Sequence, residues 1–138
     1  MEPAGQPIAI NVEFAEKYPL EILIAEDNPL NQKLIEKILN KLGYTPELVE
    51  NGEKALERVK EKKFDILLMD LQMPIVDGME STKLIKEQVD DSQQPAIIAL
   101  TANVSSQTKD ACMAIGMDEF MAKPVKIDKL ALLLQRFA

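Results

Sequence analysis

Hydrophobic residues in this chain alternate between short continuous runs and runs with the spacing of a helix face. The short apolar runs predict buried strands, and the 3.6-residue spacings between them predict amphipathic helices. The predicted strands cover residues 20–25, 45–49, 64–69, 96–100 and 117–121. The predicted helices cover residues 28–42, 52–61, 79–89, 104–115 and 126–137. The chain therefore contains five consecutive strand–helix units.

Five such units in 138 residues predict an α/β fold, a doubly wound parallel sheet with helices on both faces. The flavodoxin-like strand order 2-1-3-4-5, with five helices, is common at this size, although the pattern also fits other doubly wound orders. Residues 1–19 contain three prolines and a glycine and are predicted to be a leader or linker. Residues 20–138 are predicted to form the folded domain.

Side chains that can do chemistry follow four of the five predicted strands. Glu26 and Asp27 follow the first strand, Asp70 the third, Thr101 the fourth and Lys123 the fifth. Because ligands of open α/β sheets bind outside the carboxyl ends of the strands, we expect these side chains at one edge. Three converging carboxylates repel one another unless a cation lies among them. Without histidine or thiol nearby, that cation is expected to be Mg²⁺ or Mn²⁺.

Asp70 is the best-placed nucleophile of this set, because it follows the most apolar strand. Carboxylates form acyl phosphates, and a bound Mg²⁺ keeps positions open for phosphate oxygens, so the pattern favours phosphoryl chemistry. Lys123 would neutralise the phosphoryl charge, and Thr101 would donate a hydrogen bond to it. Taken singly, such residues are more often turn formers, helix caps or solvated charges. Their joint placement at one edge is what supports the functional interpretation.

Composition narrows the function further. The chain has no histidine, which excludes His-based triads and imidazole bases, so any phosphohistidine must come from elsewhere. The net charge of −7 argues against binding to nucleic acid or to an anionic membrane surface. Cys112 is the single cysteine, so no internal disulfide is available and a reducing cytoplasm is expected. No apolar run reaches the roughly 18 residues that a membrane span needs.

Four short motifs resemble the receiver domain of response regulators from two-component systems. They are Glu26-Asp27, the stretch 68–74 with Asp77-Gly78, the stretch 100–102, and Lys123-Pro124. The resemblance extends over about residues 20–138, and its specificity comes from four motifs in this order at suitable spacing. It implies a domain that accepts a phosphoryl group from a phosphohistidine, and not an enzyme that turns over a substrate.

The same resemblance implies roles for the acidic residues. Asp70 would be the phosphoacceptor. Asp27 and Asp70 would bind Mg²⁺ directly, with the backbone carbonyl of Gln72 as the third protein ligand. Glu26 would act through a metal-bound water, and it departs from the many receivers that have aspartate at this position.

Further residues correspond to the family's switch. Thr101 and Lys123 would contact the phosphoryl group, and Phe120 stands where the family has its switch aromatic, here without a hydroxyl. Gln72 and Asn103 stand where receivers tune the loss of the phosphoryl group to water. Phosphorylation would draw Thr101 toward the new charge and let Phe120 turn inward. The surface read by partners would be formed by helix 104–115, strand 117–121 and helix 126–137.

The stretches 14–20, 25–32 and 100–103 resemble receivers joined to the kinase core of hybrid sensor histidine kinases. We therefore expect a C-terminal receiver of a hybrid kinase, with a free-standing regulator as the alternative. The expected partner is a histidine kinase or a histidine phosphotransfer domain, without nucleic acid or direct membrane contact. The expected location is cytoplasmic, including the cytoplasmic end of a membrane-bound kinase. A weak homodimer is also compatible with the sequence.

Three other functions share parts of this pattern. A Mg²⁺-dependent phosphatase of the haloacid dehalogenase type also uses an aspartate nucleophile, but it needs a second aspartate where this chain has Gln72. A flavodoxin-like FMN carrier would need a Ser/Thr/Gly-rich loop after the first strand, and residues 28–30 do not provide it. A receiver used only for docking remains an alternative, although the expected side-chain set is complete here.

Overall fold

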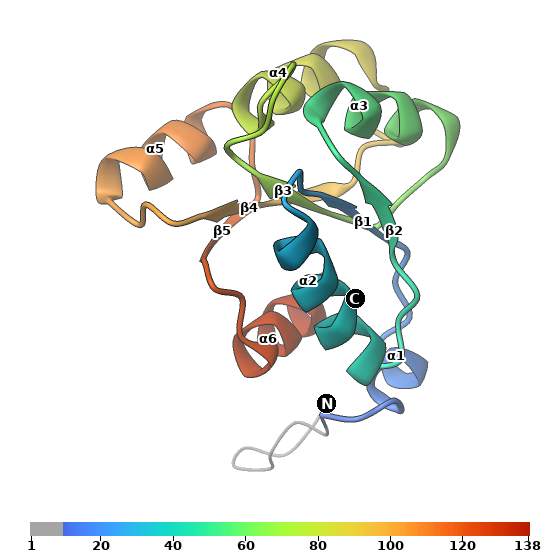
Figure 1. Cartoon of the computed structure of the whole chain (residues 1–138). Coiled ribbons are helices and arrows are strands. Elements are labelled where there is room, and N and C mark those ends of the chain that lie inside the picture. Colours follow the sequence, from blue (N-terminus) through green and yellow to red (C-terminus); the bar gives the residue numbers. More distant parts are fainter. Residues whose placement is uncertain (1–9) are drawn as a thin grey trace.

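The computed structural model describes residues 10–138 and contains one sheet between two layers of helices (Figure 1). The strands are β1 (Ile22–Ala25), β2 (Glu47–Val49), β3 (Ile66–Asp70), β4 (Ala96–Thr101) and β5 (Glu119–Ala122). The helices are α1 (Phe14–Lys17), α2 (Pro29–Lys41), α3 (Gly52–Glu61), α4 (Gly78–Gln88), α5 (Ser106–Ala114) and α6 (Ile127–Phe137). The strands are parallel in the order β2-β1-β3-β4-β5, which confirms the predicted order.

The sheet separates two hydrophobic cores. Alternate residues of each strand point to opposite faces, so Ile66 and Leu68 of β3 belong to one core and Leu67 and Met69 to the other. The first core lies under α1, α2 and α6, and the second under α3, α4 and α5 (Figure 1). Both faces of β3 are therefore covered, which explains why the sequence of this strand is continuously apolar.

Polar side-chain caps begin four of the five described helices that follow a strand, α6 being the exception. Asn28 accepts hydrogen bonds from the first turn of α2, and Asn51, Asp77 and Ser105 do the same for α3, α4 and α5. Each of these helices starts within a few residues of a strand end, except α4, which follows a longer loop. The connecting loops are consequently short at the carboxyl edge of the sheet, where the polar strand ends gather.

Helix α1 is an element that the sequence pattern did not predict, and it lies inside the predicted linker. Five helices were expected, and the described residues contain six. Phe14 is only 2% exposed and belongs to the first core, because its ring packs on Tyr18 at 4.9 Å and on Tyr44 at 6.2 Å between centroids. The division of the chain at residue 20 stays a prediction, but residues 10–19, the N-terminal strap, contact the domain closely.

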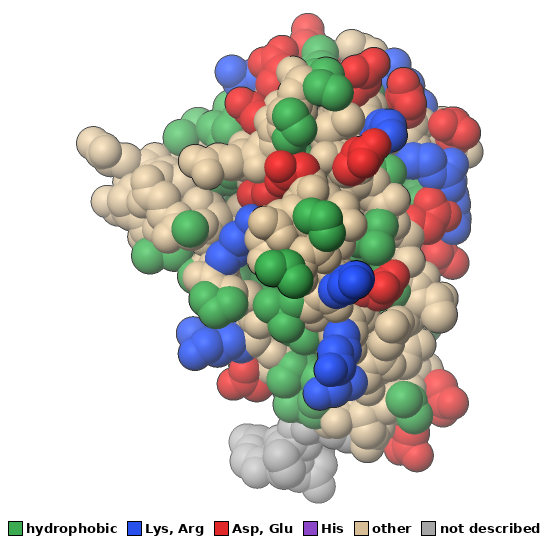
Figure 2. Space-filling view, viewed as in Figure 1, with side chains coloured by type: hydrophobic (Ala, Val, Ile, Leu, Met, Phe, Trp, Pro, Cys, Tyr) green, Lys and Arg blue, Asp and Glu red, His purple; other side chains and the backbone are tan. Residues whose placement is uncertain are grey.

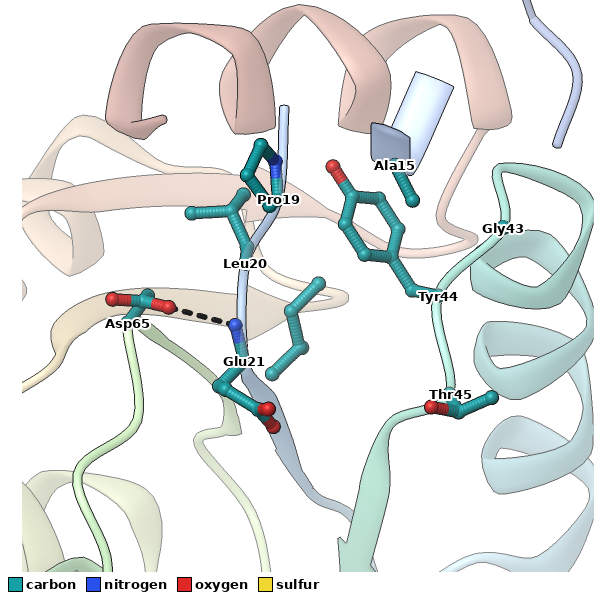
Figure 3. A pocket seen from close by; sticks show the side chains of 9 residues that line it. Ala15, Pro19, Leu20, Glu21, Gly43, Tyr44, Thr45 and Asp65 are labelled. Carbon is teal, nitrogen blue, oxygen red and sulfur yellow. Dashed lines mark hydrogen bonds between the residues drawn. The ribbon is translucent and has the colours of Figure 1, made fainter. Parts of the chain in front are cut away.

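The turn between α2 and β2 is shaped to receive this strap (Figure 3). Gly43 has a φ of +94°, and a Cβ on it would lie 2.3 Å from the carbonyl oxygen of Val12. Only glycine satisfies both conditions. The backbone N–H of Ala15 donates to the carbonyl of Leu42 at 2.9 Å, so the strap is also held by the main chain. Among residues 10–138 no helix is long and apolar enough to cross a membrane.

Candidate functional site

The carboxyl edge of the sheet carries a cavity of about 380 Å³, called here the site cavity. Its walls come from the ends of β1, β3 and β4, from the loop after β5 and from the first turn of α2. It is lined by Glu26, Asp27, Asn28, Asn31, Asp70, Gln72, Thr101, Ala102, Asn103 and Lys123. Every site residue predicted from the sequence lies here, with the exception of Phe120.

Three carboxylates meet in the site cavity. Glu26 is fully buried, Asp70 is 4% exposed and Asp27 is exposed to solvent. One carboxylate oxygen from each lies within 4.8 Å of the other two. Asp70 occupies the last position of β3, the central strand, and Glu26 and Asp27 directly follow the neighbouring β1. These oxygens are the kind of donor that a hard divalent cation takes, so the cluster fits such an ion.

Lys123 brings the positive charge of the site. Its ammonium nitrogen lies 3.0 Å from Asp70 Oδ1 and 3.2 Å from Glu26 Oε2, and its side chain is 20% exposed. One ammonium group therefore faces two buried carboxylates. A single cation cannot balance two anions at low dielectric, so the site keeps an excess of negative charge.

The ionisation of Glu26 reflects chiefly its burial. Burial, with a further contribution from the neighbouring Asp70, raises the pKa of Glu26 to about 7. Asn31, which donates from Nδ2 to Glu26 Oε1 at 2.7 Å, and Lys123 act in the opposite direction but do not outweigh burial. A cation bound at this cluster would therefore compete with a proton on Glu26 near neutral pH.

Two side chains that support Glu26 were missed by the sequence interpretation. Asn31 holds the Glu26 carboxylate, and Gln32 donates from Nε2 to the Glu26 backbone carbonyl at 2.6 Å. Both lie in the first two turns of α2, which starts immediately after β1. The signal was their position, because the first turn of a helix that follows a strand faces the end of that strand.

Thr101, Asn103 and Gln72 form the polar rim of the site cavity. The Thr101 hydroxyl, 7% exposed as a residue, accepts a hydrogen bond from the Asn103 backbone N–H at 3.0 Å. The backbone N–H of Gln72 donates to Asp70 Oδ1 at 3.2 Å. Asn103 Oδ1 accepts from the N–H of Ser105, the cap of α5. The loops after β3 and β4 are thereby tied to the residues that bear the chemistry.

Phe120 lies outside the site cavity. It is half-buried on β5, beside Ala99 of β4, and borders a separate cavity of about 530 Å³ between β5 and α6. Lys123 lines both cavities. Lys123 therefore lies between the cavity beside Phe120 and the site cavity.

A comparison with protein-family models identifies the family of this domain. The model described as "Response regulator receiver domain" matches residues 22–135. This chain belongs to the response regulator receiver domain family. The match covers β1 to α6, including every side chain that lines the site cavity, and leaves the strap outside.

Curated relatives of this receiver domain include hybrid kinases. It is 44% identical over 124 residues to hybrid signal transduction histidine kinase H of Dictyostelium discoideum, covering 87% of this chain and 9% of that protein. It is 37% identical over 132 residues to the histidine-protein kinase BarA of Escherichia coli K12, covering 96% of this chain and 14% of that protein. The chain thus spans a small part of the relatives it matches.

Solved receiver structures have the same fold. The receiver domain of a sensor histidine kinase from Pseudomonas aeruginosa PAO1, with magnesium coordinated in its active site cleft, matches at 40% identity and a TM-score of 0.78. The match covers 86% of this chain and 96% of that one. A Saccharomyces cerevisiae receiver domain, solved in complex with a histidine phosphotransfer protein, matches at 29% identity and a TM-score of 0.76. That match covers 86% of this chain and 88% of the other.

Proposed function

We propose that this receiver domain accepts a phosphoryl group from a phosphohistidine onto Asp70, in a Mg²⁺-dependent step of a two-component phosphorelay. The observation that carries the proposal is the place of Asp70 between an ammonium group and two further carboxylates. Lys123 lies 3.0 Å from it, and Glu26 and Asp27 offer oxygens within 4.8 Å. Such a site matches the charge of a phosphoryl group with a bound cation better than it matches any uncharged ligand.

The transfer is a displacement at phosphorus. An Asp70 carboxylate oxygen attacks the phosphorus atom, an O–P bond forms, and the N–P bond to the donor imidazole breaks. The electron pair of that bond stays on the imidazole nitrogen, which takes a proton. The donor histidine belongs to another protein or domain, because this chain contains none.

Mg²⁺, with Mn²⁺ as a substitute, would be held by Asp27, Asp70 and the backbone carbonyl of Gln72, with Glu26 acting through a water molecule. The ion supplies positive charge for the phosphoryl oxygens during transfer. Support comes from the carboxylate cluster and from the related kinase receiver, whose structure contains magnesium in its cleft. Buried Glu26 anchors the cluster, while exposed Asp27 is accessible to an ion that arrives from solvent.

Lys123 and Thr101 would act on the phosphoryl group itself. Once Asp70 carries the group, the ammonium of Lys123 pairs with a phosphoryl oxygen, and the Thr101 hydroxyl donates to another. To do so, the Thr101 hydroxyl must give up its donation to the Asn103 carbonyl, which lies 3.3 Å away. Gln72 and Asn103, which follow the neighbouring strands β3 and β4, would set how readily water reaches the phosphorus.

The switch would then reach the surface through Phe120. Movement of Lys123 would change the wall of the cavity beside Phe120, into which the ring could turn. The surface of α5, β5 and α6 changes with it, as a shift between two packings biased by the new charge. Partners that distinguish the phosphorylated state would bind this surface.

The donor would be a histidine kinase or a histidine phosphotransfer domain. Leu30 and Leu34, on α2 next to the site cavity, are 78% and 40% exposed, and Figure 2 shows hydrophobic side chains on the face where α2 lies. A related yeast receiver was solved in complex with a histidine phosphotransfer protein. The kinase relatives support a receiver that is part of a larger hybrid kinase. We infer that this receiver is cytoplasmic and has no turnover activity of its own.

The experiment is intact-mass measurement after incubation with phosphoramidate or acetyl phosphate, with and without Mg²⁺. We expect one added phosphoryl mass on the wild type, only with Mg²⁺, and none on Asp70→Asn. Asp65→Asn is the matched control, because Asp65 precedes the same strand at its other end. Absence of the adduct from the wild type at every sampled time would contradict the proposal and favour a docking domain.

A further inference from the structure

Strand β2 sends no side chain into the site cavity, yet the residue that begins the following helix holds the loop beside the site. The β3–α4 loop comprises residues 71–77 and contains Gln72. Gly52, the first residue of α3, donates its backbone N–H to the Val76 carbonyl of this loop at 2.8 Å. A Cβ on Gly52 would lie 2.4 Å from the same carbonyl, so the contact requires glycine.

Ser81 ties this contact to α4. Its hydroxyl is completely buried and donates to the Gly52 carbonyl at 2.7 Å, across the interface between α3 and α4. Its backbone N–H donates to the carbonyl of Asp77, the last residue of the loop, at 2.9 Å. Ser81 therefore binds both the loop and the helix that supports the loop.

The β3–α4 loop needs such support, because its backbone is in an unfavourable conformation. Ile75 has a φ of +69°, a left-handed value that β-branched residues rarely adopt. The Val76 N–H donates to the Pro74 carbonyl at 2.8 Å, which closes a three-residue turn around Ile75. Strained turns of this kind persist only when their surroundings hold them. The bond from Gly52 is made at the residue next to the strain.

The same end of the loop also abuts the phosphoacceptor. A Cβ on Gly78 would lie 2.2 Å from the carbonyl oxygen of Asp70, so the start of α4 touches the end of β3. A displacement of α4 or of the loop would therefore move the backbone on which Asp70 and Gln72 are carried. Mg²⁺ demands nearly ideal octahedral geometry, so its affinity is sensitive to small displacements of its ligands.

We propose that Ser81 is a positioning residue, which acts through Gly52 to keep the β3–α4 loop in the geometry that binds the divalent cation. The inference rests on the proposed function, because it concerns the same cation site. Ser81 contacts neither the ion nor the phosphoryl group. Its hydroxyl fixes the spacing between α3 and α4, and the strained loop between them stays in place.

The test compares Ser81→Ala with Thr82→Val. Thr82 is the matched control, because it is equally buried and its hydroxyl donates at 2.8 Å to the Gly78 carbonyl within its own helix. The measurements are hydrogen exchange of the Gly52 amide without metal, and titration with Mg²⁺ and with Ca²⁺. We expect Ser81→Ala to speed Gly52 exchange and to weaken Mg²⁺ binding about three- to tenfold, less than the loss of a direct partner of a metal ligand.

Comparing the affinities for Ca²⁺ and Mg²⁺ distinguishes a positioning role of Ser81 from a general loss of stability. Because Ca²⁺ accepts irregular coordination, its affinity should fall less than that of Mg²⁺ in Ser81→Ala, and neither should change in Thr82→Val. Equal losses in both variants, or wild-type Mg²⁺ affinity in Ser81→Ala, would overturn the inference and leave the proposed function intact. A wild-type domain that binds no Mg²⁺ would overturn both.

Discussion

The two edges of the sheet each carry a cavity and several carboxylates, but they differ in how completely those carboxylates are paired with positive charge. At the amino edge, a basal cavity of about 310 Å³ lies between the strap, the start of β1 and the turn after α2 (Figure 3). Asp65 there accepts the Glu21 backbone N–H at 2.7 Å, and Lys62 lies within 3.3 Å of Glu21 and Glu47. Each of these three carboxylates has a partner.

At the carboxyl edge the partners are too few. Lys123 serves both Glu26 and Asp70, and the pKa of Glu26 rises to about 7. At the base, burial alone would raise the pKa of Glu47, but hydrogen bonds from Arg58 and Lys62 outweigh it and lower that pKa. Neither cavity volume nor the number of acidic residues distinguishes the two edges. The balance of charge does. The amino edge has paired carboxylates, whereas the carboxyl edge has the carboxylate cluster that we propose binds a cation.

The largest expected effect is on stability at the base. Phe14→Ala should lower the free energy of unfolding by about 3–5 kcal/mol, because a buried ring is replaced by a cavity. Urea denaturation measures it. Val12→Ala, at an exposed position of the same strap, is the control and should change stability by less than about 0.5 kcal/mol. A small effect of Phe14→Ala would show that the strap does not contribute to the domain.

The next largest effect is expected on the phosphorylation rate, which should differ between variants of Lys123 at the carboxyl edge and Lys62 at the amino edge. Lys123→Ala should slow phosphorylation by phosphoramidate about 100-fold at saturating Mg²⁺, because an essential positive charge at the phosphoryl group is lost. Lys62→Ala removes a lysine that also faces two carboxylates, and it should leave the rate unchanged. The time course of the phosphorylated mass gives both rates. Similar rates for the two variants would end the distinction between the edges.

A third expected effect is on pH dependence. The folded-state pKa of Glu26 lies above its ordinary value of 4.5, so ionising this carboxyl destabilises the metal-free domain as pH rises from 4.5 to about 7. Mg²⁺ competes with that proton, so its affinity should fall about tenfold per pH unit below 7 and level off above it. Calorimetric titration measures it. Glu26→Gln should remove this step, and a wild-type affinity that is constant between about pH 6 and pH 8 would contradict the assignment.

The smallest expected effect is a change of stability with pH, opposite in direction to that caused by Glu26. The pKa of Glu47 is lowered in the folded state, so its contribution to stability is present at neutral pH and is lost on acidification. Glu47→Gln should cost less than about 1 kcal/mol at neutral pH, because the pair with Arg58 is partly exposed. Thermal unfolding at neutral and acidic pH measures it. Glu61→Gln, whose ion pair with Arg58 is longer at 3.5 Å, should cost less still.

The sequence allowed the architecture and five members of the site cavity to be predicted from periodicity, whereas Gln72 and Asn103 came from the family resemblance and Asn31 was missed. Parallel strands bring their carboxyl ends to one edge, so Asp27, Asp70 and Thr101 could be placed together without coordinates. The exposure of Asp27 and the burial of Glu26 could not, because adjacent residues with similar side chains have no difference in pattern. The functional roles of these residues stay predictions until they are tested.

Contacts between distant segments were out of reach. Helix α1 has too few residues to leave a periodic signal, and its burial depends on the close approach of the strap to Gly43. The bond between Ser81 and Gly52 joins residues 29 positions apart, within helices that were each predicted correctly. Propensity and spacing describe elements one at a time, whereas such bonds depend on how two elements meet.

The positions of the aromatic residues determine which parts of this protein optical spectroscopy can follow. The chain has no tryptophan and two tyrosines, Tyr18 and Tyr44, and both lie beside Phe14 at the amino edge. Intrinsic fluorescence and near-ultraviolet circular dichroism therefore arise chiefly from the strap and the turn that receives it. These signals follow detachment of the strap without a label, whereas events at the phosphoacceptor require an introduced tryptophan or another probe.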